Sequence, residues 1–328
     1  MQPRVLVTRK LLPEALAWLA GRVDFEIATL TDELPRERLL EALADKDGLL
    51  PLLVDAIDRE VMDAAPRLKV IANCAAGYNN IDIGHARARG ILVTNTPGVL
   101  TEATADLTWA LILAVARRIP QSEAFLRRGA FKGWAIDLCL GKDLAGKRLG
   151  IIGMGRIGRA VAERAAAFRM EVVYHDPAPL APAEEARLAV RYTPLDDLLA
   201  SSDVVTVHAT LTPETHHLIS ASRLRIMKPQ AILINVSRGP IVDETALVSA
   251  LAAGRLWGAG LDVYEREPSV EPGLLKLPNV VCLPHIGSAT HETRLAMCMM
   301  AARNLVQGLR GERPDNLIPE MQDLAGAK

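Results

Sequence analysis

Short apolar runs alternate with segments of helical periodicity along most of the chain. In the first third the apolar runs cover residues 5–8, 48–50, 70–72 and 91–94, and helical patterns cover residues 36–44 and 58–64. Strand-like runs separated by helices are typical of an α/β protein with parallel sheets. We therefore expect a parallel sheet over this part of the chain.

The pattern changes after the turn at Pro97-Gly98, where an apolar helix is expected over residues 101–118 and an irregular connection over residues 127–147. Six further apolar runs precede a last helix over residues 290–309; they lie at residues 149–152, 171–174, 203–207, 231–235, 257–261 and 280–283. Because no third block of strands follows, we predict two doubly wound parallel-sheet domains. One, over residues 99–287, is inserted in another made of residues 1–98 and 288–328. A cleft between two such domains is where we expect a small-molecule site.

The composition narrows the functional classes. The 328 residues carry a formal net charge of −1, which offers no basic surface for nucleic acid. The most apolar helical stretch, residues 107–116, is too short to span a membrane, and the N-terminus lacks the apolar region of a signal peptide, so we expect a cytoplasmic protein. The four cysteines are not at metal-ligand spacing, and we expect reduced thiols and no metal site.

A glycine-rich turn begins the second block of strands. Residues 149–158 read Leu-Gly-Ile-Ile-Gly-Met-Gly-Arg-Ile-Gly, with an apolar strand before the turn and a helical pattern over residues 157–168 after it. In a dinucleotide-binding turn, glycines allow a tight turn, close approach of the pyrophosphate and close packing of helix on strand, while the helix N-terminus binds the phosphates. We therefore predict a Rossmann-type cofactor domain here and a flavodoxin-like substrate domain around it. The predicted cofactor contacts in the turn are Gly153, Gly155, Arg156, Ile157 and Gly158.

Asp176 ends the next apolar run, at the position where a carboxylate binds both ribose hydroxyls and repels a 2′-phosphate. No basic residue follows it in Pro-Ala-Pro-Leu, so we favour NAD, as NADH, over NADP, with NADPH as the alternative. An aspartate that only caps a turn is the other interpretation. His208, after the run over residues 203–207, is expected on the adenosine side. His216-His217 is expected to begin a helix, with no metal role.

Three polar side chains follow apolar runs in the second domain: Arg238, Glu267 and His285. The carboxyl ends of parallel strands form the ligand crevice of such a sheet, so we expect the three side chains to meet there. Hydride addition to a carbonyl needs a proton donor, which suits His285, and Glu267 could hold its other ring nitrogen. Arg238 could bind a carboxylate and polarise the carbonyl, which selects a 2-keto acid. Taken singly, each residue is equally well a surface or loop residue.

These residues carry a resemblance to the D-isomer-specific 2-hydroxyacid dehydrogenase family over residues 5–318. The most specific motifs are residues 153–158, 235–239, 261–268 and 284–290. The resemblance implies that Arg238, Glu267 and His285 are catalytic. It also implies that Asp262 binds the nicotinamide carboxamide and that a loop with Ala76 and Gly77 grips the substrate carboxylate. The further cofactor contacts that we predict are Thr104, Ser237 and Gly287.

Within the family, the motifs most resemble those of glyoxylate/hydroxypyruvate reductases, which implies a substrate loop with Leu52 and Leu53 and a contact from Ser288 to the hydroxyl of hydroxypyruvate. Glyoxylate, hydroxypyruvate and larger 2-keto acids all remain open, as does the direction of the reaction. Family members are dimers, and residues 118–147 resemble their exchange arm, so we expect a homodimer. Phosphite dehydrogenases are also similar, but carry a lysine where Ala76 stands. A non-catalytic NAD-sensing binding protein is the alternative from another class.

Overall fold

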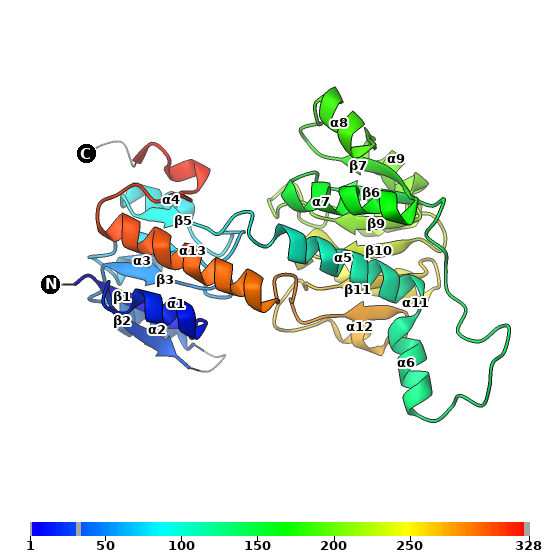
Figure 1. The fold of residues 1–328 in the computed structure, drawn as a ribbon, viewed down its shortest axis with the longest axis horizontal. Coiled ribbons are helices and arrows are strands. Elements are labelled where there is room, and N and C mark those ends of the chain that lie inside the picture. The colour runs from blue at the N-terminus through cyan, green and yellow to red at the C-terminus, as the bar shows by residue number, and fades with distance from the viewer. Residues whose placement is uncertain (1, 31–33, 325–328) are drawn as a thin grey trace. The chain divides into compact units, whose positions relative to one another are not determined.

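The computed structural model describes residues 2–30 and 34–324. The chain folds into two compact units, each built around its own parallel sheet (Figure 1). Unit 1 comprises Met1–Leu100 and Ser288–Lys328, and unit 2 comprises Thr101–Gly287. The chain therefore leaves unit 1, completes unit 2 and returns to unit 1.

Unit 1 has a five-stranded parallel sheet in the order β2-β1-β3-β4-β5. This is the flavodoxin-like order of doubly wound folds. The strands are β1 (Arg4–Arg9), β2 (Asp24–Thr29), β3 (Gly48–Leu50), β4 (Val70–Ala72) and β5 (Leu92–Thr94). The helices are α1 (Pro13–Leu19), α2 (Arg36–Leu43), α3 (Arg59–Asp63), α4 (Ile83–Ala88) and α13 (His291–Leu309), with a 3-10 turn at Pro319–Met321.

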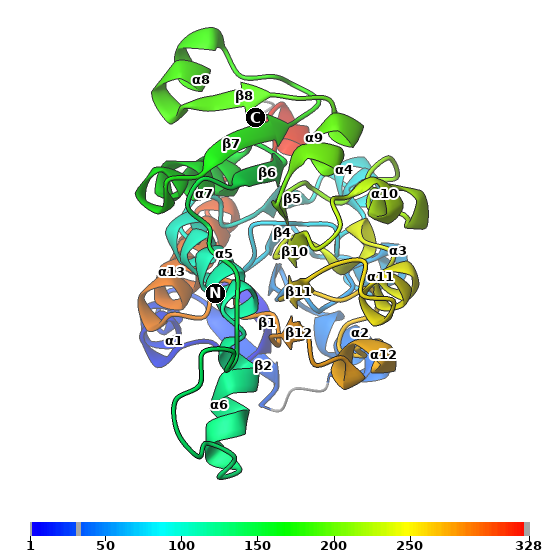
Figure 2. The same ribbon diagram turned by 90° about the vertical axis from the view of Figure 1, so that its right-hand side faces the viewer.

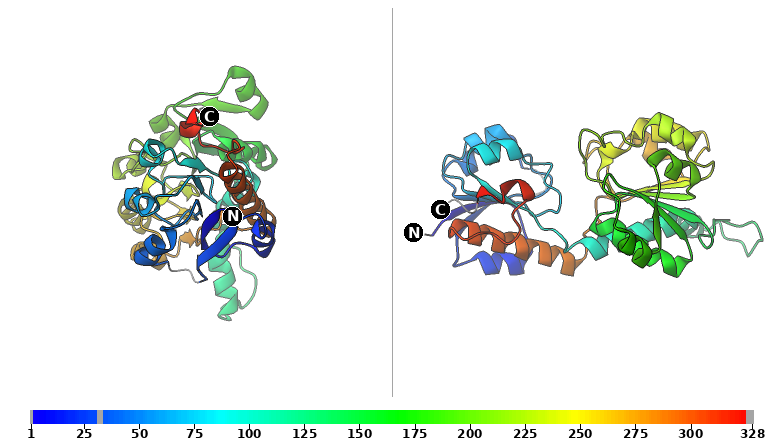
Figure 3. Two further views of the ribbon diagram at one scale, coloured as in Figure 1. Left: turned by 90° about the vertical axis from the view of Figure 1, so that its left-hand side faces the viewer. Right: turned by 90° about the horizontal axis from the view of Figure 1, so that it is seen from above.

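Both faces of the unit 1 sheet are covered, which explains why its inner strands β3 and β4 carry no polar side chain. Leu6 packs in one core with side chains of α2, α3 and α4. Its neighbours Val5 and Val7 pack in the other, with side chains of α1 and α13. Successive strand residues point to opposite faces, so one apolar run fills both cores. The right-hand view of Figure 3 shows helices on the two sides of the sheet.

Unit 2 has a seven-stranded parallel sheet in the order β12-β11-β10-β9-β6-β7-β8. Six of these strands follow the order of a complete dinucleotide-binding sheet, and β12 adds a seventh at one edge. The strands are β6 (Arg148–Ile152), β7 (Glu171–His175), β8 (Val190–Tyr192), β9 (Val204–Val207), β10 (Ile232–Asn235), β11 (Gly258–Leu261) and β12 (Val280–Cys282). Figure 2 shows them stacked from β8 to β12.

Helices cover both faces of this sheet as well. Side chains of α5 (Thr101–Ala116) and α7 (Arg156–Ala165) fill one core. Side chains of α9 (Leu195–Ser201), α10 (Ala221–Ile226), α11 (Glu244–Ala252) and α12 (Pro272–Lys276) fill the other. Helix α8 (Pro182–Leu188) lies beside β8, and α6 (Ile119–Arg127) leads into a segment that projects from unit 2 (Figure 1). In the described part of the chain, no helix has the length and apolarity to cross a bilayer.

Several local features differ from the expectations drawn from the sequence. Strands β2 and β8 and helix α6 were not predicted, and the helix predicted over residues 101–118 ends at Ala116. The expectation that His216-His217 begins a helix is wrong, because both lie in a turn and α10 begins at Ala221. Ser220, with extended backbone angles, is the residue at which the chain enters that helix.

Candidate functional site

Strands β6 and β9 are neighbours in the unit 2 sheet, although β7 and β8 lie between them in sequence. The chain thus leaves β6 toward one edge and returns on the other side of it. Such a reversal point is where ligands bind in an open parallel sheet, outside the carboxyl ends of the strands. The glycine turn follows β6 directly, and His208 follows β9.

The three glycines of the turn meet three different requirements. Gly153 has φ +93°, in the left-handed region that side chains disfavour. A Cβ on Gly158 would lie 2.2 Å from the Gly153 carbonyl oxygen, so the helix approaches the turn closely. A Cβ on Gly155 would meet nothing within 4 Å, so space is open beside the N-terminus of α7. An open cradle at a helix N-terminus fits the phosphates of a dinucleotide.

Asp176 is tied to this turn from the end of β7. Its Oδ2 accepts from Met154 N at 2.8 Å, and its Oδ1 accepts from Ala178 N at 3.0 Å. Each oxygen keeps a second lone pair for another donor. The carboxylate is therefore fixed next to the glycine turn and can still accept from the hydroxyls of a ribose.

His208 lies beside the same turn, since a Cβ on Gly153 would be 2.7 Å from its carbonyl carbon. Burial lowers the pKa of His208 to about 3, so the imidazole is neutral at physiological pH. Its Nε2 lies 2.9 Å from Thr206 Oγ1, and its Nδ1 is shielded from solvent and, among the described residues, has no hydrogen-bond partner. A bound ligand could supply the hydrogen-bond partner that the shielded Nδ1 of His208 needs.

The structure brings Glu267 and His285 together on the carboxyl side of β11 and β12. Glu267 Oε2 lies 2.8 Å from His285 Nδ1, and about a quarter of each side chain is exposed. Burial opposes ionisation of Glu267, but the hydrogen bond and charge of His285, the Tyr264 N–H and the charge of Arg238 together hold its pKa below the ordinary value. His285 has φ +53°, an uncommon conformation for a residue with a side chain. The imidazole is thus oriented with Nε2 away from its carboxylate partner.

Arg238 follows β10 and feels the charge of Glu267. Burial lowers the pKa of Arg238, and the charge of Glu267 opposes that shift. Its backbone is held by Asn235, whose Nδ2 donates to the Arg238 carbonyl at 3.1 Å. Ser237 Oγ donates to the Ala209 carbonyl, which joins this loop to the one after β9. The guanidinium therefore lies in surroundings where its charge is weakly screened.

Asp262 holds the loop that carries His285. Its Oδ1 accepts from Ile286 N and its Oδ2 from Gly287 N, both at 2.7 Å. Burial raises the pKa of Asp262, and the two N–H groups and the charge of His285 counteract that shift. Thr104 Oγ1 donates to the Gly287 carbonyl at 3.1 Å, so α5 is tied to the same turn. Both residues predicted as cofactor contacts thus also fix the turn after His285.

The predicted substrate residues of unit 1 lie in two neighbouring loops. Leu52 and Leu53 follow β3, while Ala76 and Gly77 follow β4. Within residues 2–30 and 34–324, the N–H groups of Ala76 and Gly77 donate to no protein acceptor. Ser288 is the first residue of the second segment of unit 1, and its carbonyl accepts from Thr290 N at 2.9 Å.

A pair of asparagines that was not predicted, the buried Asn73 and the partly buried Asn80, joins these two loops. Asn73 Nδ2 donates to the Gly77 carbonyl at 3.0 Å and to Asn80 Oδ1 at 3.1 Å. Asn80 Nδ2 donates to the carbonyls of Leu52 and Asp55, at 3.2 and 3.0 Å. The two asparagines flank the Ala76-Gly77 loop in sequence, which is the only signal that could have pointed to them.

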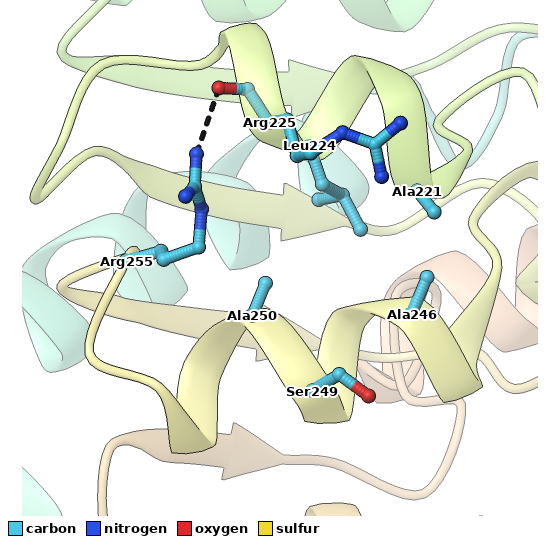
Figure 4. A pocket seen from close by; sticks show the side chains of 7 residues that line it. All are labelled: Ala221, Leu224, Arg225, Ala246, Ser249, Ala250 and Arg255. Atoms are coloured by element: carbon cyan, nitrogen blue, oxygen red, sulfur yellow. Dashed lines mark hydrogen bonds between the residues drawn. The ribbon is translucent and has the colours of Figure 1, made fainter.

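A shallow groove lies between α10 and α11 (Figure 4), where Leu224, Ala246 and Ala250 form its apolar part. Arg255 Nη2 donates to the Arg225 carbonyl at 2.9 Å across it. None of the residues that line this groove is among those predicted to bind cofactor or substrate.

Comparisons with known proteins show which family the chain resembles. Residues 109–287 match the model of the family "D-isomer specific 2-hydroxyacid dehydrogenase, NAD binding domain". The chain is 47% identical over 322 residues to a glyoxylate reductase of Thermococcus litoralis, covering 97% of each chain. A solved structure of a Thermus thermophilus protein shares 49% identity with a TM-score of 0.91, covering 96% of this chain and 99% of that one. An NADPH-dependent glyoxylate/hydroxypyruvate reductase of Sinorhizobium meliloti, solved with NADP and malonate, shares 36% identity with a TM-score of 0.86, covering 98% of each.

Proposed function

Because the chain belongs to the D-isomer-specific 2-hydroxyacid dehydrogenase family, we propose that it reduces glyoxylate or hydroxypyruvate to the D-2-hydroxy acid. It is an NAD(P)-dependent oxidoreductase of this family. The observation that carries the proposal is the 2.8 Å pair between Glu267 and His285, beside Arg238, on a sheet that the family's NAD-binding domain covers. A proton donor and a carboxylate-binding cation are the two groups that reduction of a 2-keto acid requires.

In this proposal His285 is the general acid and base. A dinucleotide held at the turn of Gly153, Gly155 and Gly158 supplies the hydride when it is bound. Glu267 holds Nδ1 of His285, which leaves Nε2 to deliver a proton to the carbonyl oxygen of the substrate. The same carboxylate stabilises the protonated imidazole before the transfer.

Arg238 binds the substrate in this proposal. Its guanidinium donates to the substrate carboxylate and toward the carbonyl oxygen on which negative charge develops. Because the side chain is partly buried, its charge acts more strongly there than it would in water. The guanidinium is cationic at physiological pH, and the charge of Glu267 opposes the lowering of its pKa by burial.

The unit 1 loops supply the remaining substrate contacts that we propose. The N–H groups of Ala76 and Gly77 grip the carboxylate, as backbone nests do for other anions. Leu52 and Leu53 limit the size of the substrate side chain, and Ser288 meets a hydroxyl of hydroxypyruvate. This assignment predicts a preference for short 2-keto acids over those with bulky side chains.

We propose NADH as the preferred cofactor because Asp176 is held beside the glycine turn, and a carboxylate that accepts from the ribose hydroxyls would repel a 2′-phosphate. The Sinorhizobium meliloti relative is NADPH-dependent, so both cofactors occur among related proteins. Around that position, in Asp-Pro-Ala-Pro-Leu, no basic residue accompanies Asp176 to bind a 2′-phosphate.

We also propose a homodimer, in which the segment from α6 to residue 142 is covered by a second copy of the chain. Its exposed apolar side chains support this, with Trp134 80% and Ile136 78% exposed. Water-exposed apolar side chains gathered on one segment indicate a protein–protein contact. Sedimentation equilibrium of the wild-type protein should give twice the 35.5 kDa chain mass. The double variant Trp134→Ser, Ile136→Ser should shift the protein toward monomer. A monomeric wild type would contradict the proposal.

The decisive experiment is a panel of glyoxylate, hydroxypyruvate and phenylpyruvate with NADH and NADPH, followed by absorbance of the reduced cofactor. Turnover that is fastest with glyoxylate or hydroxypyruvate and NADH is expected. Tight NADH binding without turnover of any 2-keto acid would overturn the enzyme assignment and favour a cofactor-sensing protein. Turnover of phosphite with NAD would instead favour a phosphite dehydrogenase.

A further inference from the structure

The loop after β11 carries two glutamates that pair with two different histidines. Glu267 pairs with His285, as described above. Glu265 Oε1 lies 2.9 Å from Nε2 of His217, which belongs to the turn after β9. Two imidazole–carboxylate pairs therefore hold the loop: the Glu267–His285 pair, which we assign to catalysis, and the Glu265–His217 pair.

His217 also contacts the loop of Arg238 through its backbone. Its N–H donates to the Pro240 carbonyl at 2.7 Å, two residues beyond Arg238. The residue has φ +48°, in the left-handed region, where a side chain is uncommon and the surrounding contacts must hold it. One residue thus holds the Arg238 loop with its backbone and the Glu267 loop with its side chain.

The two loops contact each other directly. A Cβ on Gly239 would lie 1.8 Å from the Tyr264 carbonyl carbon, so no side chain separates their backbones. Tyr264 N donates to Glu267 Oε1 at 2.9 Å. A displacement of residues 264–265 is therefore transmitted both to the Glu267 carboxylate and to the residue next to Arg238.

A second carboxyl group, that of Glu244, lies close to Glu265, and the hydrogen bond from His217 bears on the repulsion between the two. Glu244 N donates to Glu265 Oε1 at 2.9 Å, and Glu265 N donates to Glu244 Oε1 at 2.7 Å, so two carboxyl groups are held close together. Burial raises the pKa of Glu244, the Glu265 N–H counteracts this, and the charge of Glu265 raises it further. A hydrogen-bond donor on Glu265 offsets the repulsion between the two groups. His217 is that donor.

We propose that His217 is a positioning residue for the reaction, which through Glu265 and Pro240 keeps Glu267 and Arg238 in place. This inference rests on the proposed function. His217 itself touches neither substrate nor cofactor in it. Its effect is on geometry, and displacement of reacting groups by about 1 Å can reduce turnover about a hundredfold.

The test compares His217→Phe, which removes the donor, with His217→Gln, whose amide can still donate to Glu265. His216→Phe is the matched control, because His216 is the exposed neighbour in the same turn. For His217→Phe we expect kcat/KM for glyoxylate to fall about tenfold to a hundredfold. The Kd of NADH, read from fluorescence, should stay within about twofold, because the glycine turn is not part of this contact network. His217→Gln should recover most of the loss.

A second readout uses oxamate, an unreducible analogue of a 2-keto acid, titrated into the NADH complex. We expect His217→Phe to weaken oxamate binding about tenfold, and His217→Gln to restore it. Equal oxamate affinity and equal kcat/KM in wild type and His217→Phe would overturn the positioning role. Failure of His217→Gln to recover activity while it folds normally would overturn it as well. An inactive wild type that still binds oxamate would contradict the proposed function instead, so the two failures are distinguishable.

Discussion

At the carboxyl ends of the unit 2 strands, the three predicted catalytic residues have ionisable side chains, whereas the loops after β3 and β4 in unit 1 present apolar side chains and backbone N–H groups. His285 and Glu267 each keep about a quarter of the side chain exposed. The ion pair that supports the unit 1 loops is different: Arg9 Nη2 lies 3.0 Å from Asp55 Oδ1, and only 2% of the Asp55 side chain is exposed. That pair fixes a loop and offers no titratable group to a ligand.

This difference in side-chain chemistry indicates which steps of the proposed reaction each unit would serve. Groups that gain or lose a proton must reach the substrate, so they stay partly exposed and are oriented by a single partner. Groups that define shape can be held by buried amides, whose hydrogen bonds do not depend on pH. We therefore expect substitutions of the proton-transfer pair Glu267 and His285 in unit 2 to lower kcat, and substitutions in the unit 1 loops to raise KM.

The largest expected effect comes from removing the proton donor of unit 2. His285→Ala should lower kcat about a hundredfold to ten-thousandfold, because general acid catalysis contributes about that much. Steady-state kinetics with glyoxylate measure the loss, and NADH fluorescence should show cofactor binding within about threefold of wild type. His291→Ala removes a histidine that is 62% exposed and should behave as wild type. Loss of NADH binding in His285→Ala would mean that the histidine is structural, and the comparison would fail.

A smaller effect is expected from the amide support of unit 1. Asn80→Ala removes the Nδ2 donor from the carbonyls of Leu52 and Asp55, which are then left without that partner. The two loops should loosen, so KM for glyoxylate should rise about tenfold while kcat changes less than about threefold. Gln322→Ala, which removes an exposed amide elsewhere in unit 1, is the control. A fall in kcat with unchanged KM would contradict the division between the units.

The sequence was most informative where a strand is buried on both faces. Residues 70–72 are apolar throughout and residues 231–235 are apolar up to the final Asn235, and both were predicted as strands. Strands β2 and β8 were missed because they lie at sheet edges and expose charged or polar side chains, such as Asp24 and Arg191. Their place in the sheet is decided by pairing with β1 and β7, which local sequence does not encode.

The same limit applies to the site. Arg238, Glu267 and His285 could be proposed because each follows an apolar run within a recognisable motif. The bond from Asp262 to Gly287 joins residues 25 positions apart, and the pair of His217 and Glu265 joins residues 48 positions apart. Such contacts depend on how loops from different strands meet, so neither the hydrophobic periodicity of the sequence nor the spacing of its motifs predicts them. The error over His216-His217 has the same origin, since the turn is fixed by bonds to residues 240–241.

The smallest expected effect concerns the choice between NADH and NADPH. In unit 2 the charge of Asp176 is proposed to select the cofactor and to take no part in the reaction itself. Asp176→Ala should reduce the preference for NADH over NADPH about tenfold, which corresponds to about 1.4 kcal/mol. The carboxylate otherwise binds ribose hydroxyls and repels a 2′-phosphate. Asp176→Asn separates the two contributions, because an amide oxygen can still accept from Met154 N while the charge is lost. The ratio of kcat/KM for the two cofactors is the measurement, with Asp197→Ala, an exposed acidic residue of α9, as the charge control. If both Asp176 variants keep the wild-type ratio of kcat/KM for NADH and NADPH, the Asp176 carboxylate only caps the turn. The charged groups of unit 2 would then act in the reaction and not in the choice of cofactor.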